Sequence, residues 1–254
     1  MIETLSESAG TWIRIGMSAP PGNVLSLDVV RALRHAIREA GARRGVKWLT
    51  IEGTGDDFSF GASIPEHLPE VMPRVLPEMH QLLRDLLAFP SPTAALVQGR
   101  CLGGGFELAL ACDDIIASGD ATFGFPEIRL CAFPPAGAAL LPLRVGTSRA
   151  ARAIVTGEPR SAQYWHDAGL ISIVAAHVSM IDGARDWFNR HLRPRSAVAL
   201  SHAAEASRLT LRAVAEPALA VAERQYLGRL LHTADAAEGI QSWIDKRPPV
   251  WKDS

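Results

Sequence analysis

The sequence predicts an α/β fold in which strands and helices alternate first and helices dominate later. Residues 12–17 alternate as a half-buried strand does, and an amphipathic helix follows from Leu27 to about Gly41, with Ser26 as its N-cap. Residues 93–97 form an apolar run typical of a buried strand, after which a glycine triplet precedes an apolar helix. Strands that alternate with helices imply right-handed crossover connections.

The remaining elements follow from the same patterns. Residues 47–52 indicate a strand, and a proline-punctuated stretch at 65–77, for which we expect a mobile segment, precedes a helix over 78–88. The further expected elements are an apolar helix at 106–112, short strands near 114–117 and 122–123, helices at 149–156, 161–168 and 180–191, and three more helices to about residue 246.

The chain is long enough for one large domain with an appendage. We predict a core over residues 1–194, which carries the functional site, and a helical C-terminal region over residues 195–254. The leucine and alanine faces of this C-terminal region are too apolar to stand alone, so it is expected to pack on the core or on another subunit.

Composition excludes several functional classes. The chain is 48% hydrophobic and 21% charged, which is ordinary for a globular protein, and its formal net charge of −1 provides no field to hold nucleic acid or an anionic membrane. Its three cysteines have no metal-ligand spacing, so we expect a reducing compartment and no metal. No leader or membrane-length apolar run is present, which predicts a cytoplasmic protein.

The glycine triplet Gly103–Gly105 is the first candidate for a functional site. Glycines between a buried strand and a helix let the backbone approach a ligand closely, and the first helical NH groups have no intrahelical partner. With the helix dipole added, a developing negative oxygen would be favoured near Gly104. A tight turn without a ligand explains the glycines alone equally well.

Two isolated acids accompany these glycines. Glu107 follows the last glycine by two residues in an apolar helix, and Glu127 follows Pro126 in the apolar segment FGFPEIRL. Lone acids in apolar surroundings tend to have raised pKa values, which suits acid–base catalysis near neutral pH. Either acid by itself is more often a salt-bridge partner, but the pair beside the glycines favours a catalytic site.

Four stretches of the chain resemble the crotonase, or enoyl-CoA hydratase/isomerase, superfamily. They are GDDFSFGAS (55–63), ALVQGRCLGGGFELALACD (95–113), ATFGFPEIRL (121–130) and DAAEGIQSWIDKRPPVW (235–251). The resemblance covers about residues 12–251. It implies a crotonase-type spiral of ββα units, a helical C-terminal trimerisation region, a homotrimer or dimer of trimers, and an acyl-CoA substrate with no further cofactor.

The resemblance also implies roles for individual residues. The amides of Ala62 and Gly104 would hold the thioester oxygen, Glu107 would deprotonate a water that attacks Cβ, and Glu127 would deliver a proton to Cα. These roles describe a hydratase. Further positions implied to contact coenzyme A or the acyl group are Leu25, Phe60, Ser63, Ile64, Gly103 and Lys246, although a lysine so near the C-terminus is more often only solvated.

The segment 131–137 departs from the common pattern of the superfamily. Pro135 stands where the superfamily commonly has a glycine whose NH helps to hold the water, and proline has no NH. The water must therefore be held differently.

The departures themselves resemble one branch of the superfamily, the hydratases of cyclohexa-1,5-diene-1-carbonyl-CoA. A cyclic substrate would fit an apolar pocket lined by Phe125, Leu130 and Phe133, although aromatic residues in such a segment are more often core. His67 lies on the loop expected to cover that pocket, where it could contact the substrate or shuttle a proton, although a loop histidine is more often only exposed.

Other functions on the same fold stay open. A straight-chain 2-enoyl-CoA hydratase would use the same two acids. An enoyl-CoA isomerase is disfavoured because isomerases often lack one of the glutamates, and a thioester hydrolase would need water aimed at the carbonyl carbon. A nucleic-acid-binding member is disfavoured because the arginines of helix 27–41 form at most a modest basic face.

Overall fold

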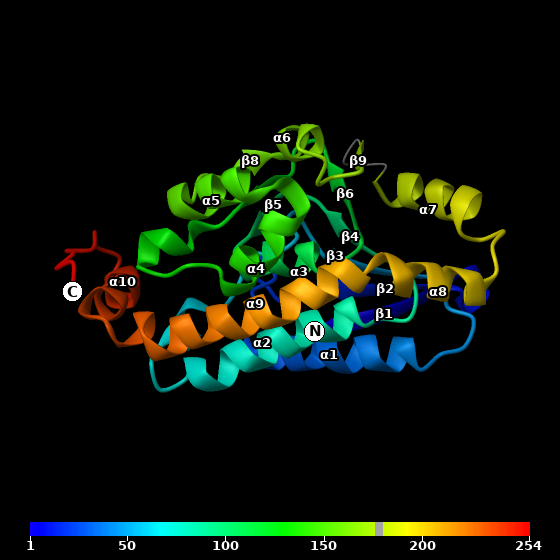
Figure 1. The fold of residues 1–254 in the computed structure, drawn as a ribbon. Coiled ribbons are helices and arrows are strands. Elements are labelled where there is room, and N and C mark those ends of the chain that lie inside the picture. The colour runs from blue at the N-terminus through cyan, green and yellow to red at the C-terminus, as the bar shows by residue number, and fades with distance from the viewer. Residues whose placement is uncertain (176–179) are drawn as a thin grey trace.

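The computed structural model describes residues 1–175 and 180–254 and confirms an α/β architecture, with two sheets surrounded by helices (Figure 1). The larger sheet has the order β1-β2-β3-β4-β6-β9, formed by Ile2–Glu7, Trp12–Met17, Trp48–Gly53, Thr93–Val97, Asp114–Ser118 and Ile173–Ala175. The smaller sheet has the order β5-β7-β8, formed by Arg100–Leu102, Thr122–Gly124 and Arg160–Ser161. β1 pairs antiparallel with β2 and β7 with β8, whereas the other strand pairs are parallel.

Helices connect and cover these strands. The α-helices are α1 (Leu27–Gly41), α2 (Met72–Leu87), α3 (Gly104–Leu110), α4 (Pro135–Val145), α5 (Thr147–Thr156), α6 (Ala162–Asp167), α7 (Met180–His191), α8 (Ala197–Ser207), α9 (Leu209–Gly228) and α10 (Ala234–Ile244). Short 3-10 helices are η1 (Ser8–Gly10), η2 (Ile64–His67), η3 (Pro126–Leu130) and η5 (Leu230–His232). In Figure 1, α1, α2 and α9 lie along one side of the larger sheet.

Alternation along the strands divides the core between the two faces of the larger sheet. Trp12 and Trp48 point to the face covered by α7, where their rings lie 5.0 Å apart and contact Phe188. Their neighbours Ile13 and Leu49 point to the opposite face and join the main core with α1, α2 and α3. Because both faces are covered, the central strands are apolar throughout, as expected for buried parallel strands.

The predicted helix over Leu27–Gly41 is confirmed as α1. The Ser26 hydroxyl accepts a hydrogen bond from the Val29 amide at 3.4 Å, so the expected N-cap is present. Side chains at helical spacing are buried on one face, among them Leu33 and Ile37.

Several elements differ from the sequence-based expectation, since β1, β5, β8 and β9 were not expected and α2 begins earlier. β1 was not expected, because its central residues are exposed and only its pairing with β2 makes the segment a strand. α2 begins at Met72 rather than at residue 78, so part of the proline-punctuated stretch is helical. Pro73 lies in the first turn, where no amide hydrogen is needed, and Pro77 lies inside the helix.

The C-terminal helices pack on the core. α9 contacts α4 and α2, and Ala215 and Leu219 of α9 are fully buried in the main core. The predicted boundary between residues 194 and 195 falls in the turn between α7 and α8. Whether the two parts are separate domains stays a prediction.

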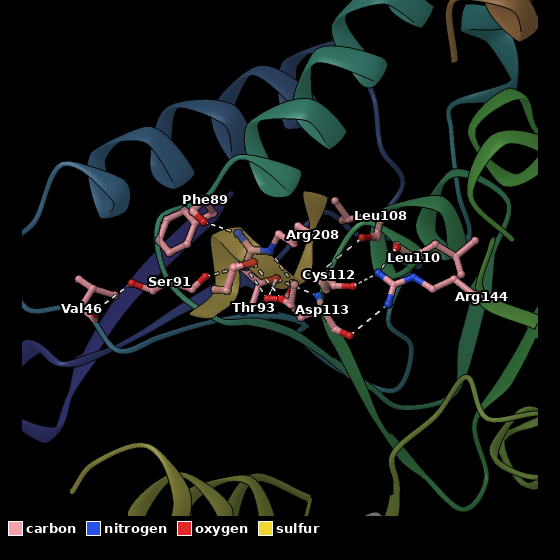
Figure 2. A network of polar contacts seen from close by, with 12 residues as sticks. Val46, Phe89, Ser91, Thr93, Leu108, Leu110, Cys112, Asp113, Arg144 and Arg208 are labelled. Carbon is pink, nitrogen blue, oxygen red and sulfur yellow. Dashed lines mark hydrogen bonds and ion pairs between the residues drawn. The ribbon is translucent and has the colours of Figure 1, made fainter. Parts of the chain in front are cut away.

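Arg208, at the junction of α8 and α9, links the C-terminal region to the core (Figure 2). Its guanidinium donates to both carboxylate oxygens of Asp113 and to the carbonyls of Phe89 and Ser91. On the other side of the same segment, Arg144 of α4 donates to the carbonyls of residues 110, 112 and 113. Both arginines therefore bind the chain where α3 ends and β6 begins.

Candidate active site

At the turn between β5 and α3, the carboxyl group of Glu127 lies against the backbone of Gly103. Gly103 has a φ of 51°, in the left-handed region that favours glycine. A Cβ atom at this position would lie 2.5 Å from Oε1 of Glu127. A glycine is therefore required at Gly103 for the carboxylate of Glu127 to rest against the start of α3.

Two backbone amides meet beside this turn. Gly104 is the first residue of α3, where helix geometry leaves the amide without an intrahelical acceptor. A Cβ atom on Gly104 would lie 3.3 Å from the amide nitrogen of Ala62, so the two amides are close neighbours. The loop before Ala62 is held by Ser59, whose hydroxyl accepts from the Gly61 amide at 3.0 Å and donates to the Asn23 carbonyl at 2.8 Å.

Glu107 lies in the first turn of α3 and is only 4% exposed. Its Oε1 accepts a hydrogen bond from the Gly137 amide at 2.8 Å, which fixes the carboxylate against the start of α4. Burial raises the pKa of Glu107 to about 7, although the amides of Gly137 and Ala136 favour the charged form. Glu107 can therefore be ionised near neutral pH and act as a base.

Glu127 lies in η3, and its carboxyl group interacts electrostatically with that of Glu107. Its Oε2 is buried and, within residues 1–175 and 180–254, has no hydrogen-bond partner. Burial, together with the negative charge of Glu107, raises the pKa of Glu127 to about 8. The amides of Gly137 and Ala136 favour the charged form of Glu107, whereas the charge of Glu107 disfavours ionisation of Glu127, so Glu107 is suited to act as the base and Glu127 as the acid.

A cavity of about 340 Å³ opens onto Glu127, whereas Glu107 is not among its lining residues. Its lining residues come from the loop after β3, from η2, from η3 and the residues after it, and from α10. They are Phe60, Ala62, Ile64, His67, Gly103, Pro126, Glu127, Arg129, Leu130, Ala132 and Trp243. A mostly apolar cavity with few polar groups is the usual form of a small-molecule site.

His67 contributes to the wall of this cavity in its neutral form. Its Nδ1 lies 2.9 Å from the Ser63 carbonyl, so Nδ1–H donates and Nε2 is left as an acceptor. Burial lowers the pKa of His67, which keeps the ring uncharged at neutral pH.

The structure brings most of the predicted site residues together. Lining the cavity are Phe60, Ala62, Ile64, His67, Gly103, Glu127 and Leu130. Glu107 and Gly104 lie behind this wall in α3, and Leu25 is buried beside it, paired through its backbone with Ala62. Ser63 does not line the cavity, but its carbonyl holds His67 in place.

Three further predicted contacts are also absent from the lining residues. Phe125 is fully buried and stacks on Phe106 at 4.8 Å, so it belongs to the core. Phe133 packs on Tyr226 and faces a shallow groove between α4 and α9. Lys246 is exposed beyond the end of α10. In each case long-range packing, which local sequence does not encode, decides where the side chain points.

Other residues of the cavity were not predicted. Arg129 and Trp243 line its wall, and the Gly137 amide binds Glu107. Arg129 lies two residues after Glu127, so its position in η3 was a usable signal. Trp243 comes from α10, more than a hundred residues away along the chain, and no local motif indicates its place.

Within 1–175 and 180–254, no group of three or more His, Cys, Asp or Glu side chains is placed to hold a metal ion. In the same ranges, no helix has the length and apolar character that a membrane crossing requires.

Comparisons with known proteins agree with this geometry. Residues 7–254 match the family described as Enoyl-CoA hydratase/isomerase. Among relatives, a cyclohexa-1,5-dienecarbonyl-CoA hydratase from Thauera aromatica is 34% identical over 97% of this chain and 95% of its own length. A 2,3-dehydroadipyl-CoA hydratase from Escherichia coli (strain K12) is 33% identical over 91% of this chain and 90% of its own length.

Solved structures share the fold as well. The crystal structure of an enoyl-CoA hydratase from Mycobacterium avium subsp. paratuberculosis K-10 has a TM-score of 0.87 and 28% identity, covering 99% of this chain and 98% of that one. An enoyl-CoA hydratase/isomerase from Xanthobacter autotrophicus Py2 has a TM-score of 0.86 and 26% identity, covering 95% and 93%. The predicted crotonase-type fold is thereby confirmed. The chain belongs to the enoyl-CoA hydratase/isomerase family of hydro-lyase-type enzymes that act on acyl-CoA.

Proposed function

We propose that this enzyme adds water to an α,β-unsaturated acyl-CoA thioester by two-glutamate acid–base catalysis. The observation that carries the proposal is the pair of buried carboxylates, Glu107 and Glu127, whose raised pKa values differ and which lie beside the amides of Ala62 and Gly104. A base, an acid and two amide donors, of which Glu127 and Ala62 line the cavity, are the groups that hydration of a conjugated thioester needs.

In this mechanism each group has one task. Glu107 accepts a proton from water while the water oxygen forms a bond to Cβ. The displaced electron pair moves through Cα to the thioester oxygen, where the amides of Ala62 and Gly104 stabilise the negative charge. Glu127 then gives its proton to Cα, which completes the addition of water.

For the acyl group, we propose the compact cyclic substrate cyclohexa-1,5-diene-1-carbonyl-CoA. The Thauera aromatica relative is named for this substrate. The cavity supports a compact group, because the separate pocket with which it shares His67, Leu130 and Ala132 has a volume of only about 10 Å³ and offers little room for a longer chain. A straight-chain 2-enoyl-CoA is the alternative substrate.

The biological setting is also proposed. Consumption of a cyclic dienoyl-CoA would place the enzyme in the degradation of aromatic compounds. A homotrimer or dimer of trimers is supported by exposed apolar side chains on α9, namely Leu209, Val214 and Val221. The free thiols of Cys101, Cys112 and Cys131 are compatible with the predicted cytoplasmic location.

A direct assay tests the substrate. The purified enzyme is given crotonyl-CoA or cyclohexa-1,5-diene-1-carbonyl-CoA, and loss of the conjugated thioester absorbance is followed while the product mass is checked for the addition of one water. We expect turnover of the cyclic substrate with the higher kcat/KM. A strong preference for crotonyl-CoA would contradict the cyclic assignment, and a product of unchanged mass would indicate isomerisation instead.

Amide substitutions test the mechanism. We expect Glu107→Gln and Glu127→Gln each to lower kcat by about 100-fold or more, because each removes a proton acceptor or donor without changing the side-chain shape. Glu39→Gln, at an exposed position of α1, serves as the matched control and is expected to retain wild-type turnover. Full activity in either active-site variant would refute two-acid catalysis.

A further inference from the structure

Residues 60–67 form one wall of the main cavity, here called the 60–67 wall. Phe60 and Ala62 line the cavity from the loop after β3, and Ile64 and His67 line it from η2. The loop half and the η2 half of this wall are attached to the rest of the protein by different kinds of contact.

The loop half is attached through its main chain. The Phe60 amide donates to the Gly22 carbonyl at 2.7 Å, and the Leu25 amide donates to the Gly61 carbonyl at 2.9 Å. Leu25 and Ala62 also form a parallel β-bridge. Because these contacts are made by the main chain, the position of the Ala62 amide does not depend on a side chain of η2.

The η2 half is attached through a side chain. Oε2 of Glu66 accepts a hydrogen bond from the Leu27 amide at 3.0 Å. The other hydrogen bonds of η2 within residues 1–175 and 180–254 are local, since the Glu66 amide and His67 Nδ1–H both donate to the Ser63 carbonyl. In these ranges, the contact between Glu66 and Leu27 is therefore the hydrogen bond that joins η2 to another element.

The Leu27 amide is a favourable partner for a carboxylate. Leu27 is the first residue of α1, so its amide has no acceptor within the helix, and the N-terminus of a helix favours negative charge. Ser26 caps the Val29 amide of the same turn, which leaves the Leu27 amide to Glu66. A hydrogen bond from an amide to a charged acceptor contributes more to stability than one between neutral groups.

η2 has few hydrogen bonds of its own to fix its position. It is four residues long and includes Pro65, whose nitrogen carries no hydrogen. α2 and α10 also pack against η2, and α10 brings Trp243 to the same cavity. Glu66 thus adds a directional contact with α1 to an element that is otherwise held by packing.

We propose that Glu66 is a positioning residue for substrate binding. Its carboxylate holds η2 against the start of α1 and so keeps Ile64 and His67 in place as the wall that the acyl-CoA contacts. Because the Ala62 amide is fixed separately, loss of the Glu66 contact weakens the binding of acyl-CoA far more than it slows the chemical step. This inference rests on the proposed hydration.

Removal and restoration of the acceptor test the proposal. Glu66→Ala removes the oxygen that binds the Leu27 amide, whereas Glu66→Gln keeps an oxygen that can accept from it. The matched control is Glu70→Ala, at an exposed position of the same stretch. For the thioester that the wild type hydrates, we expect Glu66→Ala to raise KM about tenfold with kcat within about threefold of wild type. The KM values of Glu66→Gln and Glu70→Ala are expected to stay within about twofold of the wild-type value.

Binding without turnover provides the second readout. Butyryl-CoA, which has no double bond to hydrate, is titrated into each variant by calorimetry. We expect its Kd to rise in Glu66→Ala by about the same factor as KM, and to return to near the wild-type value in Glu66→Gln. A rise in KM and Kd with retained kcat, and restoration by glutamine, supports the proposal.

Three results would overturn it. An unchanged KM in Glu66→Ala would show that the contact does not position the wall, and a loss of kcat as large as the rise in KM would show general disruption of the site. Equal impairment of Glu66→Gln and Glu66→Ala would show that the hydrogen bond to Leu27 is not the cause. These outcomes are distinct from failure of the proposed function, because in that case the wild type itself would hydrate neither unsaturated thioester.

Discussion

At the scale of single residues, the chemistry of the site depends on two acidic residues that are buried without counter-ions. No salt bridge among the described residues involves Glu107 or Glu127. Desolvation therefore raises the pKa of Glu107 to about 7 and that of Glu127 to about 8, above the ordinary value of 4.5. The same burial that prepares an acid–base pair must lower stability when the pair ionises.

The pH dependence of unfolding tests this trade-off. Between the ordinary pKa and the raised values the folded state binds more protons than the unfolded state, so the stability that these groups contribute is lost as pH rises through about 7 and 8. We expect Glu127→Gln to gain stability relative to wild type, on the order of a few kcal/mol, between about pH 5 and about pH 9. Urea unfolding at several pH values measures it.

A surface acid controls for general effects of charge. Glu70→Gln, at an exposed position, is expected to follow the wild-type pH dependence. If the Glu127→Gln and wild-type curves ran parallel over this range, the carboxyl of Glu127 would not have a raised pKa in the folded protein.

At the scale of elements, α3 is held at both ends by contacts from other parts of the chain. Its first turn supplies Gly104 and Glu107, and the segment after its last turn is bound by Arg144 and Arg208 (Figure 2). Cations near a helix C-terminus interact favourably with the unpaired carbonyls there. Seven residues are too few for a helix to be stable alone, so these contacts define its position.

Removal of Arg208 tests this anchoring. Arg208→Met leaves the partly buried Asp113 carboxylate and the carbonyls of Phe89 and Ser91 without their donor, and we expect a loss of about 3 kcal/mol in unfolding free energy. Arg212→Met, an exposed position on the same helix, is expected to change stability by less than about 0.5 kcal/mol. Chemical denaturation compares them, and equal stability of both variants would contradict the anchoring role.

At the scale of the whole molecule, some features could be predicted from local sequence patterns, whereas others depend on long-range packing. Local signals were sufficient for α1 with its Ser26 cap, and for the glycine turn beside Glu107, because the physical cause lies within a few residues. The whole fold followed from family resemblance rather than from periodicity. β1 and the orientation of Phe125 were missed because both depend on partners distant in sequence, namely β2 and the ring of Phe106.

The C-terminal region is the largest part of the cavity's surroundings whose position could not be predicted from local sequence. α10 lies against η3, the element that carries Glu127, and supplies Trp243 to the cavity wall. Their contact is so close that a Cβ atom on Gly239 would lie 2.2 Å from the Leu130 carbonyl oxygen. The wall of the cavity is thus completed by a helix more than a hundred residues from Glu127.

Gly239→Ala tests whether this contact matters for catalysis. An added methyl group must push α10 away from η3, because the opposing atom is backbone and cannot rotate aside. Trp243 would then move from the cavity wall, and we expect kcat/KM for the acyl-CoA substrate to fall by about tenfold or more. The control is Gly183→Ala in α7, where a Cβ atom meets no atom within 4 Å and replacement of a helical glycine should be neutral or stabilising. Unchanged kinetics in Gly239→Ala, with a normal melting temperature, would show that the active site does not depend on close packing of the C-terminal region.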